Sequence, residues 1–209
     1  MLSFGGQNKM SDLSFSAFKE LLLNPVAIYT FKDNDNGRLY RAATLTEEKL
    51  TYNPVTKELL CKETISSVEI SRLPQKTLIF KADCFPEPAL LFSNSREERK
   101  RADYILLAED NGKRHVVFIE LKRTKDLRHG IVAQLKGAAC VMDYCNSIMR
   151  RFWGQQFSFA QYEERFVSFS NTMGNKPIRI DPKCPIHSTP ELFMPLKGHS
   201  LTYRQLIRQ

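Results

Sequence analysis

Residues 102–122, ADYILLAEDNGKRHVVFIELK, constrain the fold of this chain more than any other stretch. Two apolar runs flank Glu109-Asp110-Asn111-Gly112, and an Asn-Gly pair between alternating apolar residues favours a tight β-hairpin turn. We therefore expect antiparallel strands over residues 103–108 and 115–121.

Charged side chains stand at one end of this expected hairpin. Side chains on a strand repeat with period two, so Glu120 and Lys122 point to the same face. Asp103 lies across the turn on the neighbouring strand. Three charged groups are therefore expected to converge at a place where charge is otherwise costly to bury.

The Glu-x-Lys tripeptide alone carries little information, because it occurs at residues 47–49, 98–100 and 120–122. Glu47 and Glu98 lie in charged segments that we expect to be exposed to solvent. Only the copy at 120–122 ends an apolar, β-branched run and has an acidic residue on the adjacent strand. The alternative for this copy is an exposed ion pair, which would contribute little to stability.

Two carboxylates and an ammonium group suit a divalent cation and a phosphate under attack. Mg²⁺, or Mn²⁺ in its place, takes oxygen ligands and keeps several waters, so Asp103 and Glu120 suffice as protein carboxylates. The backbone carbonyl of Leu121 is close enough in sequence to supply a third oxygen. Lys122 would orient a water or offset the negative charge that develops on the phosphate.

The rest of the chain predicts an α/β (α+β) protein. Apolar residues at three- and four-residue spacing form one stripe along residues 128–149, as in an amphipathic helix. Residues 171–195 are rich in Pro, Asn and Ser and predict a loop, and residues 199–209 form a strand or a short helix. We expect a further helix over residues 13–23. Further strands are expected over residues 26–31, 38–45, 64–70, 77–81, 89–92 and 165–170.

The net charge of +8 belongs to the second half of the chain. Residues 1–95 carry 11 Lys or Arg and 11 Asp or Glu, whereas residues 96–209 carry 20 and 12. A polyanionic partner such as nucleic acid explains this distribution, and a solvated basic surface explains it equally well. The 209 residues suffice for one domain with its own core.

Other features of the sequence mainly exclude classes of protein and kinds of site. No run approaches the roughly 18 apolar residues of a membrane span, and the N-terminus lacks the layout of a secretory signal, so we expect a cytoplasmic protein. The five cysteines are odd in number and never in CxxC spacing, which favours a reducing compartment. We expect Cys140 and Cys145 to be small core residues. Cys184 and His187 lack the second ligand pair of a structural zinc site.

Asp103, the run Glu120-Leu121-Lys122 and a following helix with Gln134 together resemble the PD-(D/E)xK nuclease superfamily. The resemblance covers residues 78–170, and Ala102 stands where the eponymous proline would be. It implies a restriction-endonuclease-like fold, with a mixed sheet flanked by helices and an N-terminal elaboration. It also implies Mg²⁺- or Mn²⁺-dependent hydrolysis of nucleic acid, with DNA as the expected substrate, in a restriction, phage-defence, mobile-element or repair setting.

The resemblance also implies residues around the central three. Gln134 corresponds to a glutamine that approaches the site in RecB-like members, although the tyrosine expected four residues later is Ala138 here. An additional acid commonly comes from a preceding helix, for which Glu20 and Glu98 are candidates. Basic residues that follow the motif are candidates for phosphate contacts: Lys125, Arg128 and His129.

Two other readings of the chain stay open. A member of the same fold without catalytic activity would bind nucleic acid or a protein through its basic face. An interaction protein would use residues 1–75 as a docking element, whereas we assign residues 76–209 to the nuclease-like core. A homodimer is compatible with each of these readings. The aromatic residues between positions 152 and 169 are expected to be core residues, with base stacking as the alternative.

Overall fold

The structure is a computed structural model, and it shows a mixed α/β protein with two mixed sheets, which confirms the predicted class. Within the described part of the chain, no helix is both long and apolar enough to cross a membrane. The structure describes residues 17–22, 29–33, 39–52, 54–85, 91–122, 127–155, 158–159, 161–170 and 187–208.

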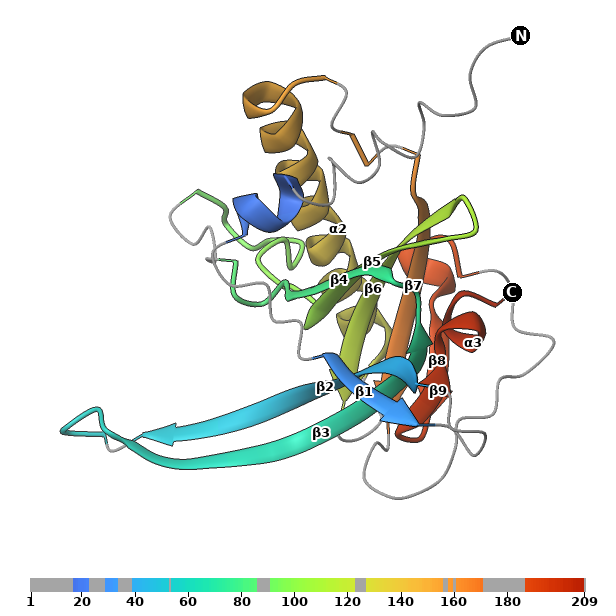
Figure 1. The fold of residues 1–209 in the computed structure, drawn as a ribbon. Coiled ribbons are helices and arrows are strands. Elements are labelled where there is room, and N and C mark those ends of the chain that lie inside the picture. Colours follow the sequence, from blue (N-terminus) through green and yellow to red (C-terminus); the bar gives the residue numbers. More distant parts are fainter. Residues whose placement is uncertain are drawn as a thin grey trace, which may run out of the picture.

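The central sheet has the strand order β4-β5-β6-β7-β8 (Figure 1). Strands β4, β5 and β6 are antiparallel neighbours, whereas β6, β7 and β8 run parallel. Helix α2 (Arg128–Phe152) connects β6 to its parallel neighbour β7, as a parallel pair requires. The strands of this sheet are β4 (Lys76–Lys81), β5 (Tyr104–Asp110), β6 (Lys113–Lys122), β7 (Glu163–Ser170) and β8 (Met194–Lys197).

The predicted hairpin of β5 and β6 is confirmed. Asn111 and Gly112 form its turn with positive φ angles of 50° and 79°, the backbone conformation that favours Asn-Gly in a type I′ turn. The strands pair in the register Tyr104↔Ile119 to Asp110↔Lys113. The charged ends of the two strands therefore come to the same edge of the sheet.

A second sheet has the order β1-β2-β3-β9. Strands β1, β2 and β3 are antiparallel neighbours, and β9 adds to β3 in parallel through residues 69–71 and 200–202. The elements not yet given are β1 (Tyr29–Asp33), β2 (Leu39–Tyr52), β3 (Leu59–Leu73), η1 (Pro190–Leu192), β9 (Ser200–Thr202), α3 (Tyr203–Ile207) and a helical segment at residues 17–21.

The hairpin of β2 and β3 is much longer than the predicted strands at residues 38–45 and 64–70. It leaves the body of the molecule as a two-stranded ribbon (Figure 1). We call its projecting part, residues 48–52 and 54–63, the arm. Among the described strands, the two strands of the arm pair only with each other.

The core has two parts, one on each face of the central sheet. Alternate residues of β5 supply both, because Ile105 and Leu107 face α2 while Leu106 and Ala108 face the second sheet. The first part includes the apolar stripe of α2 and the helical residue Phe18. The second part joins residues of β2 and β3 to β9 and α3. Three layers result, with the central sheet in the middle.

Several of the sequence predictions are wrong. Residues 91 and 92 are not in a strand, and Leu91 lies in a turn with 81% of its surface exposed, because this run precedes a solvated charged loop. Cys140 is exposed on α2, whereas Cys145 is buried as expected. The end of the chain combines both predicted alternatives, strand β9 followed directly by helix α3. Core positions are confirmed for the aromatic residues Phe159, Tyr162, Phe166 and Phe169, whereas Phe152 is 75% exposed.

Candidate functional site

Asp103 and Glu120 meet at one edge of the central sheet. Because Tyr104 pairs with Ile119, the residue before Tyr104 comes opposite the residue after Ile119. The Asp103 carboxylate is held there by the backbone, since its Oδ2 accepts a hydrogen bond of 2.6 Å from the Leu121 N–H. The predicted convergence of these two acids is therefore present in the structure.

Lys122 completes the predicted trio. Its Nζ lies 2.6 Å from Oε1 of Glu120, and the two side chains are 21% and 1% exposed. The ammonium group is thus partly open to solvent, whereas the carboxylate is enclosed. Oε2 of Glu120 is buried without a hydrogen-bond partner among the residues that the structure describes. An unpaired buried carboxylate oxygen is costly, and it marks a place where a cation would be stabilised.

Burial raises the pKa of both acids. Burial is the main cause for Asp103 and raises its pKa to about 7, while the hydrogen bond from Leu121 opposes this. Burial and the nearby Asp103 charge raise the pKa of Glu120 well above its ordinary range, and Lys122 opposes them. Raised pKa values of neighbouring carboxylates are typical of sites that bind cations or transfer protons.

Glu47 joins this cluster, although its sequence context predicted an exposed side chain. It comes from β2 of the second sheet, and its charge raises the pKa of both Asp103 and Glu120. Burial raises the pKa of Glu47 itself, with Lys122 lowering it. Oε2 of Glu47 is also buried without a hydrogen-bond partner in the described part of the chain.

Tyr104 explains how β2 reaches the cluster. Its hydroxyl donates to the Thr46 carbonyl at 2.6 Å and accepts from the Thr46 N–H at 3.1 Å. Tyr104, which follows Asp103, therefore holds the backbone of Thr46, which precedes Glu47. No local pattern in the sequence could have revealed this, because 58 residues separate the two partners. Asp83, which follows β4, adds a fourth negative charge near Asp103 and Glu47.

The donor set fits a divalent cation in charge and in atom type. Asp103, Glu120, Glu47 and Lys122 together carry two negative charges when all are ionised. Carboxylate oxygens are the ligands that Mg²⁺ and Mn²⁺ prefer. The described residues contain no preassembled group of three or more His, Cys, Asp or Glu side chains that could hold a metal ion. Binding would therefore use few protein ligands, with Asp103 and Glu120 as the central pair and the Leu121 carbonyl as predicted.

The other predicted residues lie around α2 or elsewhere. Gln134 is half-buried on α2 beside the buried Leu135, and its role stays a prediction. Lys125 lies outside the described residues. Glu20 is exposed, and the Glu98 carboxylate accepts hydrogen bonds from the N–H groups of Ser95 and Arg96, so neither acid joins the cluster.

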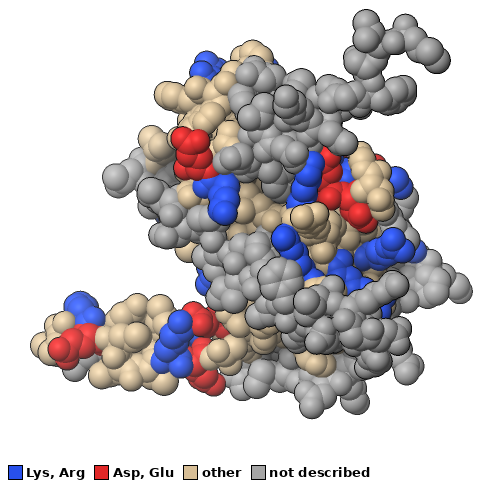
Figure 2. Space-filling view, viewed as in Figure 1, with Lys and Arg blue, Asp and Glu red and all other residues tan. Residues whose placement is uncertain are grey.

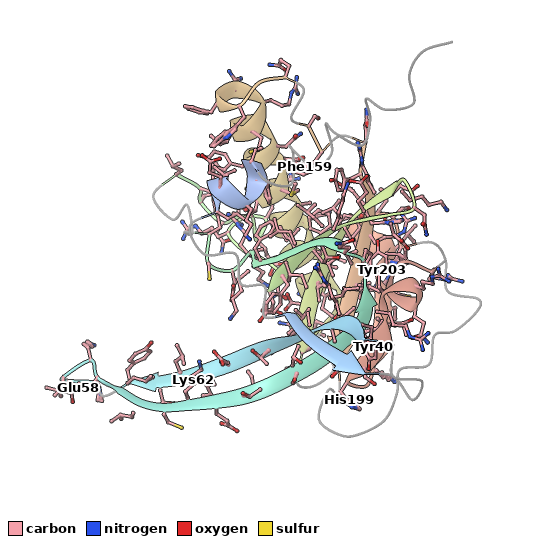
Figure 3. All side chains as sticks on the ribbon, in the orientation of Figure 1. Tyr40, Glu58, Lys62, Phe159, His199 and Tyr203 are labelled. Carbon is pink, nitrogen blue, oxygen red and sulfur yellow. The ribbon has the colours of Figure 1, made fainter. Side chains whose placement is uncertain are left out.

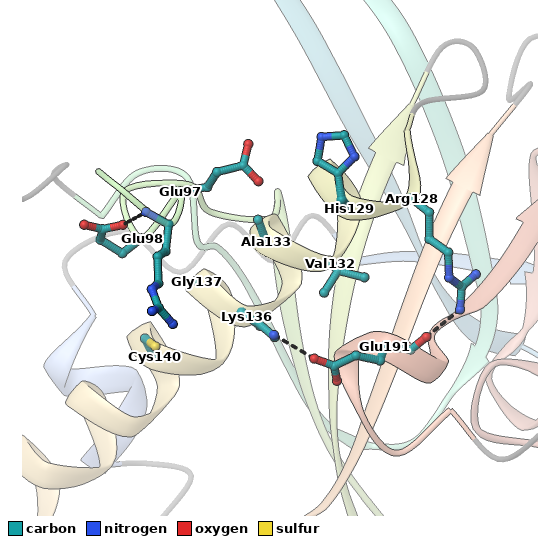
Figure 4. A pocket seen from close by; sticks show the side chains of 11 residues that line it. Glu97, Glu98, Arg128, His129, Val132, Ala133, Lys136, Gly137, Cys140 and Glu191 are labelled. Atoms are coloured by element: carbon teal, nitrogen blue, oxygen red, sulfur yellow. Dashed lines mark hydrogen bonds and ion pairs between the residues drawn. The ribbon is translucent and has the colours of Figure 1, made fainter. Parts of the chain in front are cut away.

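Arg128 and His129 line a groove of about 800 Å³ between α2, the loop before β5 and η1 (Figure 4). Arg128 donates to the Glu191 carbonyl, and its guanidinium lies 4.6 Å from the ring centre of Phe193. Lys136 forms an ion pair of 2.7 Å with the Glu191 carboxylate. Two cations of this groove therefore hold η1 against α2, and His129 is exposed at its edge.

Comparisons with models of known protein families, with curated proteins and with solved structures find no match. Any functional conclusion for this chain therefore depends on the carboxylate cluster and its surroundings.

Proposed function

We propose that the chain is a metal-dependent nuclease that hydrolyses phosphodiester bonds of nucleic acid, with DNA as the expected substrate. One observation carries the proposal: the half-buried Asp103 carboxylate and the buried Glu120 carboxylate, whose pKa values burial raises, meet a lysine at the end of a hairpin. Burying two like charges side by side is costly for a structural role alone. A cation between them offsets that cost.

Each residue has a separate task in this proposal. Asp103 and Glu120 bind the cation, and Glu47 supplies further negative charge or a water-mediated contact from β2. Bound Mg²⁺ or Mn²⁺ supplies Lewis acidity toward the phosphate and lowers the pKa of a coordinated water. The Leu121 N–H keeps Asp103 in place through its hydrogen bond. Lys122, which is 21% exposed, faces solvent where a phosphate would arrive and offsets its charge.

The order of elements supports the same proposal. The helical segment at residues 17–21 is followed, after the second-sheet strands, by β4, β5, β6, α2 and β7. This arrangement of an antiparallel trio, a crossover helix and a parallel strand resembles the restriction-endonuclease-like core. The excess of basic residues after residue 95 supports a polyanionic substrate.

Cleavage assays with matched variants test the proposal. Plasmid DNA, linear duplex, single-stranded DNA and RNA are incubated with Mg²⁺, with Mn²⁺ or with EDTA. We expect metal-dependent cleavage that slows by about a hundredfold or more in Glu120→Gln and in Lys122→Met. These two variants remove one charge each; Gln has the length of Glu, and Met is one atom shorter than Lys.

Glu164→Gln and Lys113→Met are the matched controls. Glu164 is an exposed glutamate on β7, and Lys113 is an exposed lysine at the opposite end of β6. Both controls should cleave as the wild type does. Absence of cleavage on every substrate, or equal cleavage by Glu120→Gln and the wild type, would refute the proposal.

The second candidate is a non-catalytic member of the fold that binds nucleic acid. The ion pair between Lys122 and Glu120 and the lack of a preassembled metal group among the described residues favour it. In that case the wild type binds DNA without cutting it, and its affinity is the same in EDTA and in Mn²⁺. The nuclease proposal instead expects the metal to bind the protein alone, which calorimetry measures without any substrate.

A further inference from the structure

The arm exposes an unusual amount of apolar surface for a projecting ribbon. Five of its large hydrophobic side chains are between 45% and 86% exposed: Leu50, Tyr52, Val55, Leu59 and Leu60. Contiguous exposed apolar surface of this kind marks an interaction site more often than a solvated face. A two-stranded ribbon without a layer packed against it is also marginally stable in water. The arm therefore needs a partner surface.

The charges of the arm exclude a polyanionic partner. Its acids and bases balance, with Glu48, Glu58 and Glu63 against Lys49, Lys57 and Lys62. Figure 2 shows lysine and glutamate side chains next to each other on the arm among uncharged surface. Nucleic acid would require an excess of positive charge. A protein surface with alternating charges is the complementary partner.

The edge of β3 is open for such a partner. Residues 59–63 pair with β2 on one side, while β9 joins the other side only at residues 69–71. No described strand pairs with that other side at residues 59–63. An open strand edge is a template for pairing with another chain unless charges or bulges block it.

The sequence of this edge is complementary to itself when read in the opposite direction. If two copies of KELLCKE, residues 57–63, run antiparallel with Leu60 opposite Leu60, then Glu58 faces Lys62 of the second copy. Leu59 comes opposite Cys61, and Lys57, which precedes β3 and has a φ of 61°, would come near Glu63. All four charged positions thus meet the opposite charge, and the centre is apolar. Glu58 and Lys62 project from the outer half of the arm in Figure 3.

We propose that this chain forms a homodimer in which β3 of one copy pairs antiparallel with β3 of the second copy, with Leu60 at the two-fold axis. The interface is isologous, as in most protein dimers. The ion pair between Lys62 and Glu48 within one arm does not prevent this, because it is exposed and an ammonium group has three donors. The proposal concerns assembly alone and does not depend on the nuclease activity.

Sedimentation velocity over a range of protein concentrations tests the proposal. We expect a dimer for the wild type and a dissociation constant about a hundredfold higher for Leu60→Asp, which buries two like charges at the axis. Val55→Asp is the matched control, because Val55 is 86% exposed at the tip of the arm but lies outside the paired register. It should dimerise as the wild type does.

A charge reversal tests the register itself. Glu58→Lys places a lysine opposite each Lys62 and should raise the dissociation constant about tenfold, since two unfavourable contacts form per dimer. The double variant Glu58→Lys with Lys62→Glu restores opposite charges and should recover most of the affinity. Circular dichroism shows whether each variant is folded.

Three results would overturn the proposal. The first is a wild type that sediments as a monomer at every concentration. The second is an equal effect of Leu60→Asp and Val55→Asp on the dimer. The third is a double charge variant that associates no better than Glu58→Lys alone, because register-specific pairing requires the rescue.

Discussion

Replacing Asp103 by Asn should stabilise the cation-free protein at neutral and alkaline pH. Burial raises the pKa of Asp103 from 3.8 to about 7. In the folded protein the ionised form is therefore less favourable than in the unfolded chain. Asn has the same shape, and its Oδ1 can accept the hydrogen bond from the Leu121 N–H that Oδ2 of Asp103 accepts now.

The sign and size of this change in the free energy of unfolding follow from the linkage between protonation and folding. A carboxyl group with a raised folded pKa contributes stability that is complete below its unfolded pKa and is lost as the pH rises through about 7. A difference of about 3 pH units corresponds to about 4 kcal/mol at 1.4 kcal/mol per unit. This is an upper bound, because Asp103 keeps some contact with solvent and is coupled to Glu120.

Urea denaturation in EDTA, followed by circular dichroism at a series of pH values from about 4 to about 8, measures this effect. The free energy of unfolding of Asp103→Asn should exceed that of the wild type at the alkaline end by about 2–4 kcal/mol, and the difference should vanish toward pH 4. Asp143→Asn, which changes an exposed residue of α2, should follow the wild type throughout. A difference between Asp103→Asn and the wild type that is constant with pH would refute the reasoning.

Three other measurements address the same structure. Mn²⁺ affinity, measured by calorimetry, should increase as the pH rises through about 7, because Asp103 must lose its proton to bind a cation; a pH-independent affinity contradicts this. Gly137→Ala should lower the free energy of unfolding by about 2–3 kcal/mol, because its Cβ would lie 1.7 Å from the Lys100 carbonyl oxygen, which outweighs the roughly 1 kcal/mol gain in helix propensity. Tyr104→Phe should cost about 1–2 kcal/mol in urea denaturation, because it leaves both backbone groups of Thr46 without the hydroxyl; an unchanged midpoint would show that water replaces it.

Local chemistry made the central hairpin predictable. Asn111-Gly112 specifies a turn that needs two positive φ angles, and the apolar alternation on each side sets the register. Asp103 and Glu120 followed from that register alone. Helix α2 was equally predictable, because its buried residues repeat with the period of a helix face.

Glu47 was not predictable, because its burial depends on packing between two sheets. Its neighbours in sequence are polar and charged, which ordinarily indicates exposure. The two hydrogen bonds between Thr46 and Tyr104 bring it to the cluster across a separation of 58 residues. Strand β9 was likewise ambiguous, because its three residues acquire a strand conformation only by pairing with β3.

The parallel pairing of β3 with β9 also sets the order in which the molecule can be completed. The Ser71 hydroxyl donates a hydrogen bond to the Leu201 carbonyl, and 130 residues separate the two partners in sequence. This contact can therefore form only after β9 has been synthesised. Until then the apolar side of β2 and β3, which includes Leu45, Val68 and Ile70, has no covering layer from β9 and α3. Contacts of such long sequence separation are slow to form. The hairpin of β2 and β3 is therefore synthesised long before the β9 and α3 residues that cover it.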